Sequence, residues 1–176
     1  MAQEPHHTAP DSIDALVAGW AQSLSDVDPG PLQVFSRISR IAHQLDAARR
    51  EAFAPLNLQT WEFDVLSALR RTAPPHELSP GELIRETLVT SGTMTNRITR
   101  LADRGLVTRH AGQGDGRAVR VRLTAAGQTV VEKAFRGLLA REREMLDGLS
   151  GNEEDVLART LRRLLRNFEE PPAGNQ

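Results

Sequence analysis

One stretch of the chain, residues 79–124, restricts the fold more than any other. Ser79 is followed by a proline and, three residues on, by Glu82, which is the pattern of a capped helix start. A second start at Thr90 opens a run with helical apolar spacing, and Gly105 ends that run. The alternating VRVRL segment after a glycine-rich turn predicts the returning strand of a hairpin. These residues therefore predict two short helices, a tight turn between them and a two-stranded ribbon.

Amphipathic helices are predicted on both sides of this stretch, because apolar residues recur there at intervals of three and four. Breakers such as the DPGP segment at 28–31 separate them. The chain is thus expected to be mainly α, with its strands confined to the ribbon. The expected elements are a short helix that begins at Asp11 or Ser12, helices over about 34–52 and 58–69, the two short helices over about 79–86 and 90–105, a strand from Leu106 to Arg109, the VRVRL strand, and long helices that begin at Thr124 and Ser150.

Positive charge is concentrated locally, although the net charge of the chain is only -1. Residues 96–124 contain seven arginines against two aspartates, a balance of +5, so the remaining residues carry -6. Such segregation predicts a site for an anionic partner. Arg117 lies at the predicted ribbon tip, two residues after Asp115. Arg120 and Arg122 either contact the anion or only keep an edge strand soluble.

Several classes of protein are excluded or disfavoured. The chain has no cysteine, which excludes disulfides and thiolate metal sites. His43, His76 and His110 are dispersed and lack the ligand spacing of a zinc site. The sequence has neither a glycine-rich phosphate loop nor a catalytic pairing, so we expect no enzyme, no cofactor and no metal. It shows no leader pattern and no apolar run near the ~20 residues of a membrane span, so a cytoplasmic protein without membrane association is expected.

Two short helices followed by a ribbon with a basic tip form a winged helix-turn-helix, a unit that binds DNA. The first half of the second helix offers short polar side chains that reach phosphates or base edges. An arginine at the ribbon tip suits the minor groove, where negative potential is focused. The alternative is a winged helix that binds other proteins and does not bind DNA. The predicted DNA-binding residues are Ser91, Thr93, Thr95, Asn96, Arg100, Asp115 and Arg117.

Two segments, LADRGLV after the second short helix and DGRAVRVRLTAAG across the ribbon, resemble the MarR family of bacterial transcription regulators. The resemblance runs from Val34 to Phe168 and implies a homodimer that binds double-stranded DNA at a pseudo-palindromic operator, by default as a repressor. The implied fold is a winged helix-turn-helix with a two-stranded wing, an extra N-terminal helix and a helical dimerisation region. The expected layout is one MarR-type domain over 11–170, with the winged helix-turn-helix at about 58–124, dimerisation helices at about 11–54 and 124–170, and disordered ends at 1–10 and 171–176.

A narrower resemblance, to the urate-responsive HucR, PecS and MftR branch of that family, is carried by LVTSGTMTNRI, by APPHELSPGEL and by the extra N-terminal helix. It implies a small anionic effector, urate or a related purine, held by Trp20, Asp64, Arg97 and Arg109. An indole face, guanidinium forks and a carboxylate suit a flat, weakly acidic purine. Two arginines suit a small carboxylate such as trans-aconitate or citrate equally well. From periodicity alone, Trp20 is a core or dimer anchor and Asp64 a solvated helix position, although the apolar neighbours of Asp64 favour partial burial.

Overall fold

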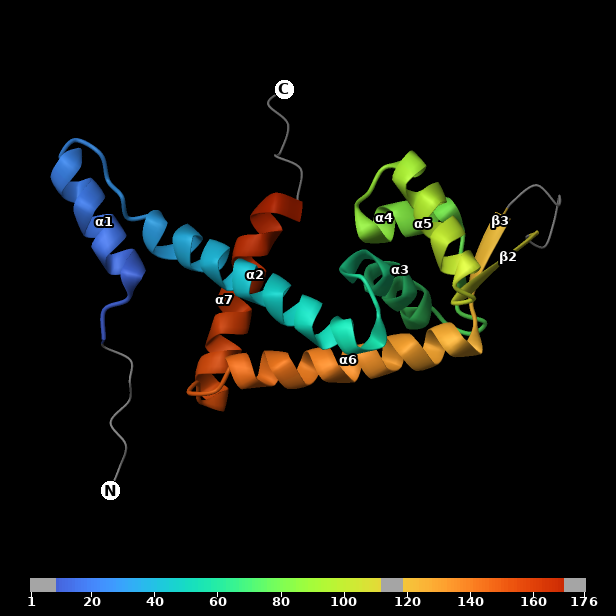
Figure 1. Cartoon of the computed structure of the whole chain (residues 1–176). Helices are drawn as coiled ribbons and strands as arrows, with labels where there is room; N and C mark the ends of the chain where they lie inside the picture. The colour runs from blue at the N-terminus through green and yellow to red at the C-terminus, as the bar shows by residue number, and fades with distance from the viewer. Residues whose placement is uncertain (1–8, 112–118, 170–176) are drawn as a thin grey trace, which may run out of the picture. The chain divides into compact units, whose positions relative to one another are not determined.

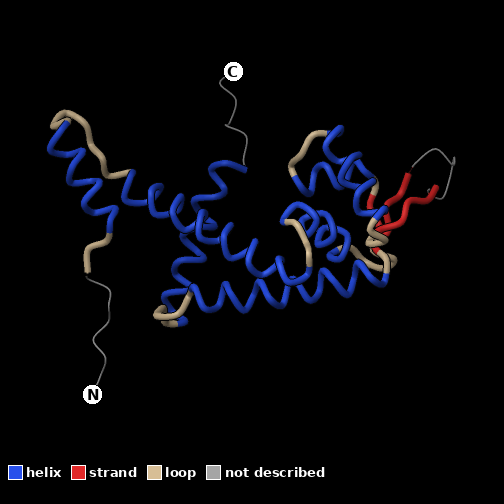
Figure 2. The backbone as a smooth tube through the Cα atoms, in the orientation of Figure 1, coloured by secondary structure: helices blue, strands red, loops and turns tan. Residues whose placement is uncertain are grey.

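The computed structural model describes residues 9–111 and 119–169. Within these ranges helices dominate, and the strands are few and short (Figures 1 and 2). The chain divides into two compact units, of which one comprises residues 37–141 and the other comprises residues 1–36 with 142–176. The larger unit contains the predicted helix-turn-helix and ribbon.

The larger unit begins within α2 and ends within α6. It contains every element between these two helices. Every strand of the described residues belongs to this unit. The bounds are α2 Leu32–Phe53, a 3-10 turn Ala54–Leu56, α3 Thr60–Arg71, β1 Glu77–Leu78, α4 Pro80–Thr87, α5 Ser91–Asp103, β2 Val107–Ala111, β3 Val119–Leu123 and α6 Ala125–Met145.

The core of this unit is built around α3. Val65, Leu66 and Leu69 of that helix are fully buried, because they recur at helical spacing on one face. Other elements pack their apolar side chains into the same core. The buried contributors from the other elements are Phe53, Leu78, Leu83, Met94, Ile98, Leu101, Leu106, Val107, Val121, Leu123, Val131, Ala134 and Leu138.

The sheet is antiparallel with the strand order β1-β3-β2. β2 and β3 form the predicted ribbon, with Val107 opposite Leu123 and Ala111 opposite Val119. β1 adds a third, two-residue strand that the sequence pattern does not predict, with Glu77 opposite Arg122. A strand this short offers no periodicity from which to recognise it.

The helix boundaries follow the predicted caps closely. Ser79 and Glu82 form a reciprocal capping box at the start of α4, as predicted. Leu88 then adopts a left-handed conformation, with φ 53, and turns the chain into α5. α3 begins at Thr60, two residues after the expected start, because Gln59 forms the cap and Leu58 is buried ahead of it.

The smaller unit consists of α1 Ser12–Ser23, the first residues of α2, the end of α6 and α7 Gly151–Glu169. Asp11 caps α1 through a capping box with Asp14, as its sequence predicts. An ion pair of 2.8 Å joins Arg143 at the end of α6 to Glu154 of α7. Most of the predicted disordered ends lie outside the described residues. No helix in the described ranges is both long and apolar enough to cross a membrane.

Gly127 in the first turn of α6 provides a test of this packing. A Cβ at that position would lie 2.1 Å from the carbonyl oxygen of Leu106 and 2.9 Å from a methyl group of Leu123. Gly127→Ala should therefore lower the free energy of unfolding by about 1–3 kcal/mol, measured by urea denaturation. The matched control is Gly137→Ala in the same helix, where the nearest atom lies at 3.9 Å. That variant should be neutral or gain up to about 1 kcal/mol. Equal stabilities of the two variants would contradict the packing.

Candidate nucleic-acid interface

The orientation of α5 follows from its buried side. Met94, Ile98 and Leu101 are buried against the core. At about 100° per residue, the opposite side of the helix carries Asn96 and Arg100, and both side chains are exposed. The N-terminal half of α5 is thereby open to a partner. All five of the predicted DNA-binding residues on this helix are exposed, namely Ser91, Thr93, Thr95, Asn96 and Arg100.

The hydroxyl groups of this half are held in place by local hydrogen bonds. The Thr95 hydroxyl donates to the Ser91 carbonyl at 3.2 Å, and the Thr99 hydroxyl donates to the Thr95 carbonyl at 3.0 Å. Thr93 shares a hydrogen bond of 2.9 Å with Thr90. A hydroxyl that donates in this way still has lone pairs with which to accept from a partner. The threonine hydroxyls of α5 are therefore already oriented in the free chain.

Three arginines of α5 and its C-terminal cap face α3. The guanidinium carbons of Arg97 and Arg100 lie 5.5 and 5.1 Å from the ring centre of Trp61. Arg104 is ion-paired with Glu62, whose carboxylate is 2% exposed. Arg104 also donates to the Asn57 carbonyl at 2.8 Å. A buried carboxylate without its cation would be costly, so this pair fixes the end of α5 against α3.

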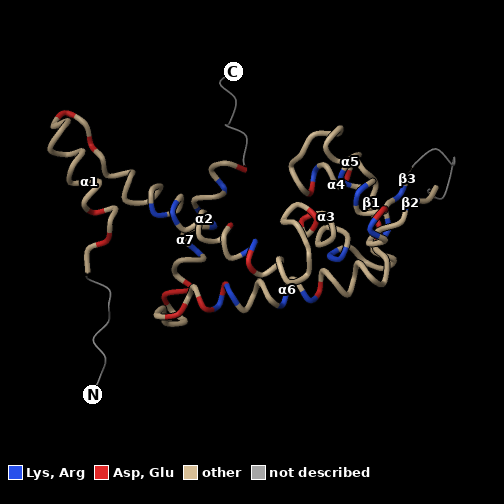
Figure 3. The backbone as a smooth tube through the Cα atoms, in the orientation of Figure 1, with Lys and Arg blue, Asp and Glu red and all other residues tan. Residues whose placement is uncertain are grey.

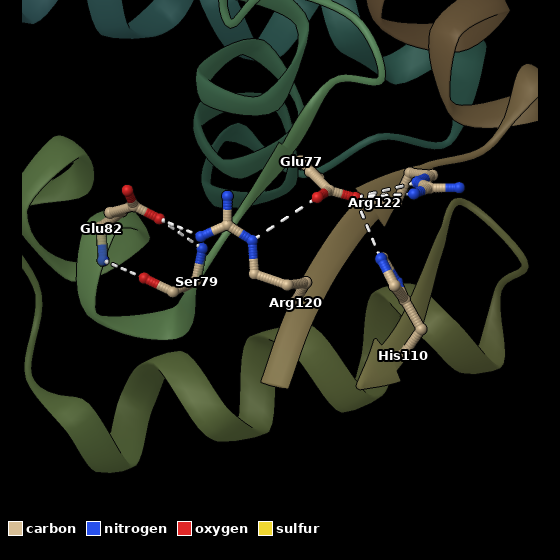
Figure 4. Close-up of polar contacts among 6 residues, drawn as sticks. All are labelled: Glu77, Ser79, Glu82, His110, Arg120 and Arg122. Carbon is tan, nitrogen blue, oxygen red and sulfur yellow. Dashed lines mark hydrogen bonds and ion pairs between the residues drawn. The ribbon is translucent and has the colours of Figure 1, made fainter. Parts of the chain in front are cut away.

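Glu77 of β1 is the centre of a charged cluster on one face of the sheet (Figure 4). Arg122 donates to one Glu77 oxygen from two nitrogens, at 3.0 and 2.9 Å, and His110 of β2 contacts the same oxygen at 3.0 Å. The hydrogen bond from Arg122 lowers the pKa of the Glu77 carboxyl below its ordinary value, and the contact with His110 adds to this. The carboxylate thus ties all three strands together.

Arg120 extends the cluster to the helix-turn-helix. Its guanidinium lies 3.6 Å from Glu77 and 2.9 Å from Glu82, so one side chain joins β3, β1 and α4 (Figure 4). The Ser79 backbone N–H also donates to Glu82 and is the main cause of the lowered pKa of that carboxyl. Figure 3 shows the basic residues of β3 beside acidic ones. Arg120 and Arg122 therefore have a structural role that neither of the two sequence interpretations included.

The predicted ribbon tip, with Asp115 and Arg117, lies outside the described residues. Its two strands are described up to Ala111 and from Val119 onwards. The base of the wing is therefore well defined, and the roles of Asp115 and Arg117 remain predictions.

The four predicted effector residues do not share a partner. Asp64 is 39% exposed and forms an ion pair of 2.5 Å with Arg49 of α2, while the deeply buried carboxylate of α3 is Glu62. Arg97 lies over Trp61, and Arg109 donates to the hydroxyl of Thr99. Positions 97 and 99 are about 200° apart around the helix, so Arg109 meets α5 on a different side from the one that carries Arg97.

Trp20 belongs to the smaller unit. Its side chain is 50% exposed, so it is not the core residue that periodicity allows. It lines a mainly apolar hollow at the junction of α1 and α2. The other residues that line this hollow are Leu24, Val27, Asp28, Pro29, Pro31 and Leu32.

Three functional candidates escape the sequence reasoning. Arg49 lies in α2 and pairs with Asp64 of α3. The expected partial burial of Asp64 is the signal that a cation lies near it. Trp61 follows the apolar spacing of α3, and it lies between the core and the arginines of α5. Glu77 belongs to a two-residue strand and carries no local signal at all.

An amphipathic α5 with an exposed polar half, packed on α3 and flanked by an anchored β-ribbon, defines a winged helix-turn-helix of the DNA-binding class. A sequence model described as the MarR family matches residues 56–118. These residues are of the MarR type, and the chain is a MarR-type DNA-binding transcription regulator, a class that is not enzymatic.

Similar proteins of known identity support this assignment. The HTH-type transcriptional regulator PecS of Dickeya dadantii is 29% identical over 156 residues, which cover 89% of this chain and 94% of PecS. The HTH-type transcriptional repressor YetL of Bacillus subtilis is 28% identical and covers 80% of this chain and 84% of its own. A mutant MarR from E. coli in complex with operator DNA has a TM-score of 0.66 at 25% identity, covering 83% of this chain and 97% of that one.

The Glu77 cluster gives a pH-dependent prediction. Because the pKa of Glu77 is lowered in the folded chain, its ion pairs stabilise the fold at pH values above 4.5, and this contribution is lost as the pH falls through the lowered value. Glu77→Gln should therefore melt below the wild type at pH 7, and the difference should vanish in acid. The control is Glu86→Gln, which breaks an exposed pair with Arg71 and should change little. A difference between Glu77→Gln and the wild type that persisted unchanged in acid would be incompatible with this role.

Proposed function

We propose that the chain is a ligand-responsive repressor that acts as a homodimer on a pseudo-palindromic operator in the cytoplasm and is released by urate or a related purine. The observation that carries the DNA part is the exposed, ordered polar half of α5 beside a wing that is ion-paired to α4. The effector part rests on the four residues taken from the family resemblance.

In the proposed complex, the N-terminal half of α5 enters the major groove. Its polar side chains contact phosphates or base edges there, namely Ser91, Thr93, Thr95, Asn96 and Arg100. Arg117 at the wing tip enters the minor groove, and Asp115 holds it in place. Repression follows in this proposal because a bound dimer excludes the transcription machinery from the operator.

A second copy of the chain is the proposed partner of the terminal helices. Among the described residues, no side chain of α7 is fully buried, although its apolar positions recur at helical spacing. α1 and the first turns of α2 also expose apolar side chains, and large exposed apolar surfaces on a folded chain mark sites of association. The exposed apolar residues of α7 are Val156, Leu157, Leu161, Leu165 and Phe168.

Sedimentation of the chain with a labelled DNA duplex of mixed sequence tests the dimer and the DNA contact together. The free chain should sediment near twice its 19.4 kDa mass, and two chains should bind each duplex. Affinity should fall steeply as salt rises, because bound phosphates release counterions.

Arg117→Ala should weaken binding to all duplexes and reduce the salt slope by about one. Arg71→Ala, which changes an exposed arginine paired with Glu86, is the control. A monomer, or binding insensitive to salt, would overturn the proposal.

The effector is proposed to bind through Trp20, Asp64, Arg97 and Arg109. Two features of the structure support roles for these residues. The Trp20 indole is half exposed and already lines a hollow, so its flat face is available to a purine. Asp64 and Arg97 lie on α3 and α5, the two helices whose packing sets the position of the DNA-reading surface.

Release from DNA then follows from competition for Arg97. An anion that pairs with this guanidinium competes with its stacking on Trp61, and its charge is repelled by Asp64. Both effects displace α5 from the position in which two recognition helices meet successive major grooves. The effector must bind the DNA-incompetent dimer more tightly than the competent one, since equal affinity shifts nothing.

A small carboxylate, such as citrate or trans-aconitate, is the second candidate effector. Arg97 and Arg109 lie on different sides of α5, an arrangement that also suits a ligand with several separated carboxylates. Trp20 favours the flat purine, because carboxylates gain little from an indole face.

Calorimetric titration separates the two candidates. Urate should bind the wild-type chain saturably, and Trp20→Ala should abolish this binding while sedimentation shows unchanged DNA affinity. Leu16→Ala, one turn earlier in α1 and 36% exposed, should keep urate binding and serves as the control. Binding of citrate or trans-aconitate without urate would replace the purine. Loss of DNA binding in Trp20→Ala would assign Trp20 a structural role instead.

A further inference from the structure

Trp61 is the one aromatic residue that contacts the cationic side of the recognition helix in the described part of the chain. It lies in the first turn of α3, is partly buried and packs against the apolar core. Its ring faces Arg97 and Arg100, at 5.5 and 5.1 Å. Both distances lie within the range of a cation–π contact, which is strongest for tryptophan.

The surroundings of these arginines have the chemistry of a phosphate site. Trp61, Thr93, Asn96, Arg97 and Arg100 line one surface hollow. The two guanidiniums supply forked donors, and the hydroxyl and the amide supply neutral ones, which together match the oxygens of a phosphodiester. No acidic side chain lines this hollow, as far as the described residues show.

A free arginine loses considerable side-chain entropy when it binds a phosphate. Stacking on an indole restricts the guanidinium before DNA arrives, so less freedom is lost on binding. The adjacent residue of α3, Glu62, holds Arg104 at the end of α5 and keeps the helix in register with Trp61. The indole is therefore a fixed platform for the two arginines.

We propose that Trp61 is a positioning residue that holds Arg97 and Arg100 as a preformed clamp for a phosphate of the DNA backbone. The proposal rests on the DNA-binding role of α5 and adds a residue to it from a different helix. Trp61 acts through the arginines and stabilises their bound orientation. Its removal should consequently weaken binding to every duplex, whatever the base sequence.

A double-mutant cycle tests the proposal by fluorescence anisotropy with a labelled duplex at several salt concentrations. Trp61→Leu should weaken binding roughly tenfold, as expected for the loss of two cation–π contacts, and Trp61→Phe should lie between Trp61→Leu and the wild type. In a chain that already carries Arg97→Ala and Arg100→Ala, the same Trp61→Leu change should have little further effect.

Two controls separate a positioning role from a loss of stability. Val130→Ala removes a partly buried side chain from α6, and it should retain full DNA affinity at whatever melting temperature it has. Trp61→Phe keeps an aromatic ring in the packing and gives a folded variant if Trp61→Leu does not fold.

The outcomes distinguish the inference from the function on which it rests. A wild-type chain that fails to bind duplex DNA overturns the DNA-binding role and the clamp together. Wild-type binding with unchanged affinity in both Trp61 variants overturns only the clamp. The same tenfold loss in the chain without the two arginines also overturns it, because Trp61 would then act independently of them.

Discussion

Burial of Met94, Ile98 and Leu101 in the core is the constraint on which the DNA-reading surface depends. A helix has one orientation once its apolar stripe is covered, so these three side chains determine which others remain available. Asn96 and Arg100 lie on the exposed side for that reason, and the guanidiniums of Arg97 and Arg100 lie over Trp61. Buried residues that do not contact DNA thus determine which side chains of α5 are exposed to it. Substitutions in the stripe would alter recognition even where they leave every polar residue in place.

The charge distribution along the chain overstates the cationic surface. The arginine-rich segment stands out in the sequence, but Arg104, Arg120 and Arg122 are ion-paired with carboxylates that lie outside that segment. The pairs join positions separated by 38–45 residues along the sequence. A count of the charged residues within one segment therefore cannot reveal them. They join helix to helix, strand to helix and strand to strand. The positive charge that remains for a partner is smaller and more localised than the segment total indicates.

The sequence predicts the fold well where the signals are local. Apolar periodicity and capping residues such as Ser79 place the helices, and the VRVRL alternation places the ribbon. β1 is missed because two residues show no period, and with it Glu77, the centre of the charged cluster. The exposed residues of α5 are predicted correctly from amphipathicity. The partners Arg49 and Trp61 are not, because a side-chain contact between helices depends on packing that no single segment encodes.

Glu82 has two tasks at once: it closes the first turn of α4 and it receives Arg120 from the wing. The beginning of the helix-turn-helix and the base of the ribbon are thereby joined into one unit. In the proposed complex, the exposed half of α5 and the base of the wing therefore keep a fixed separation. In the proposed homodimer, any adjustment to the spacing of two half-sites must then come from the helices outside this unit.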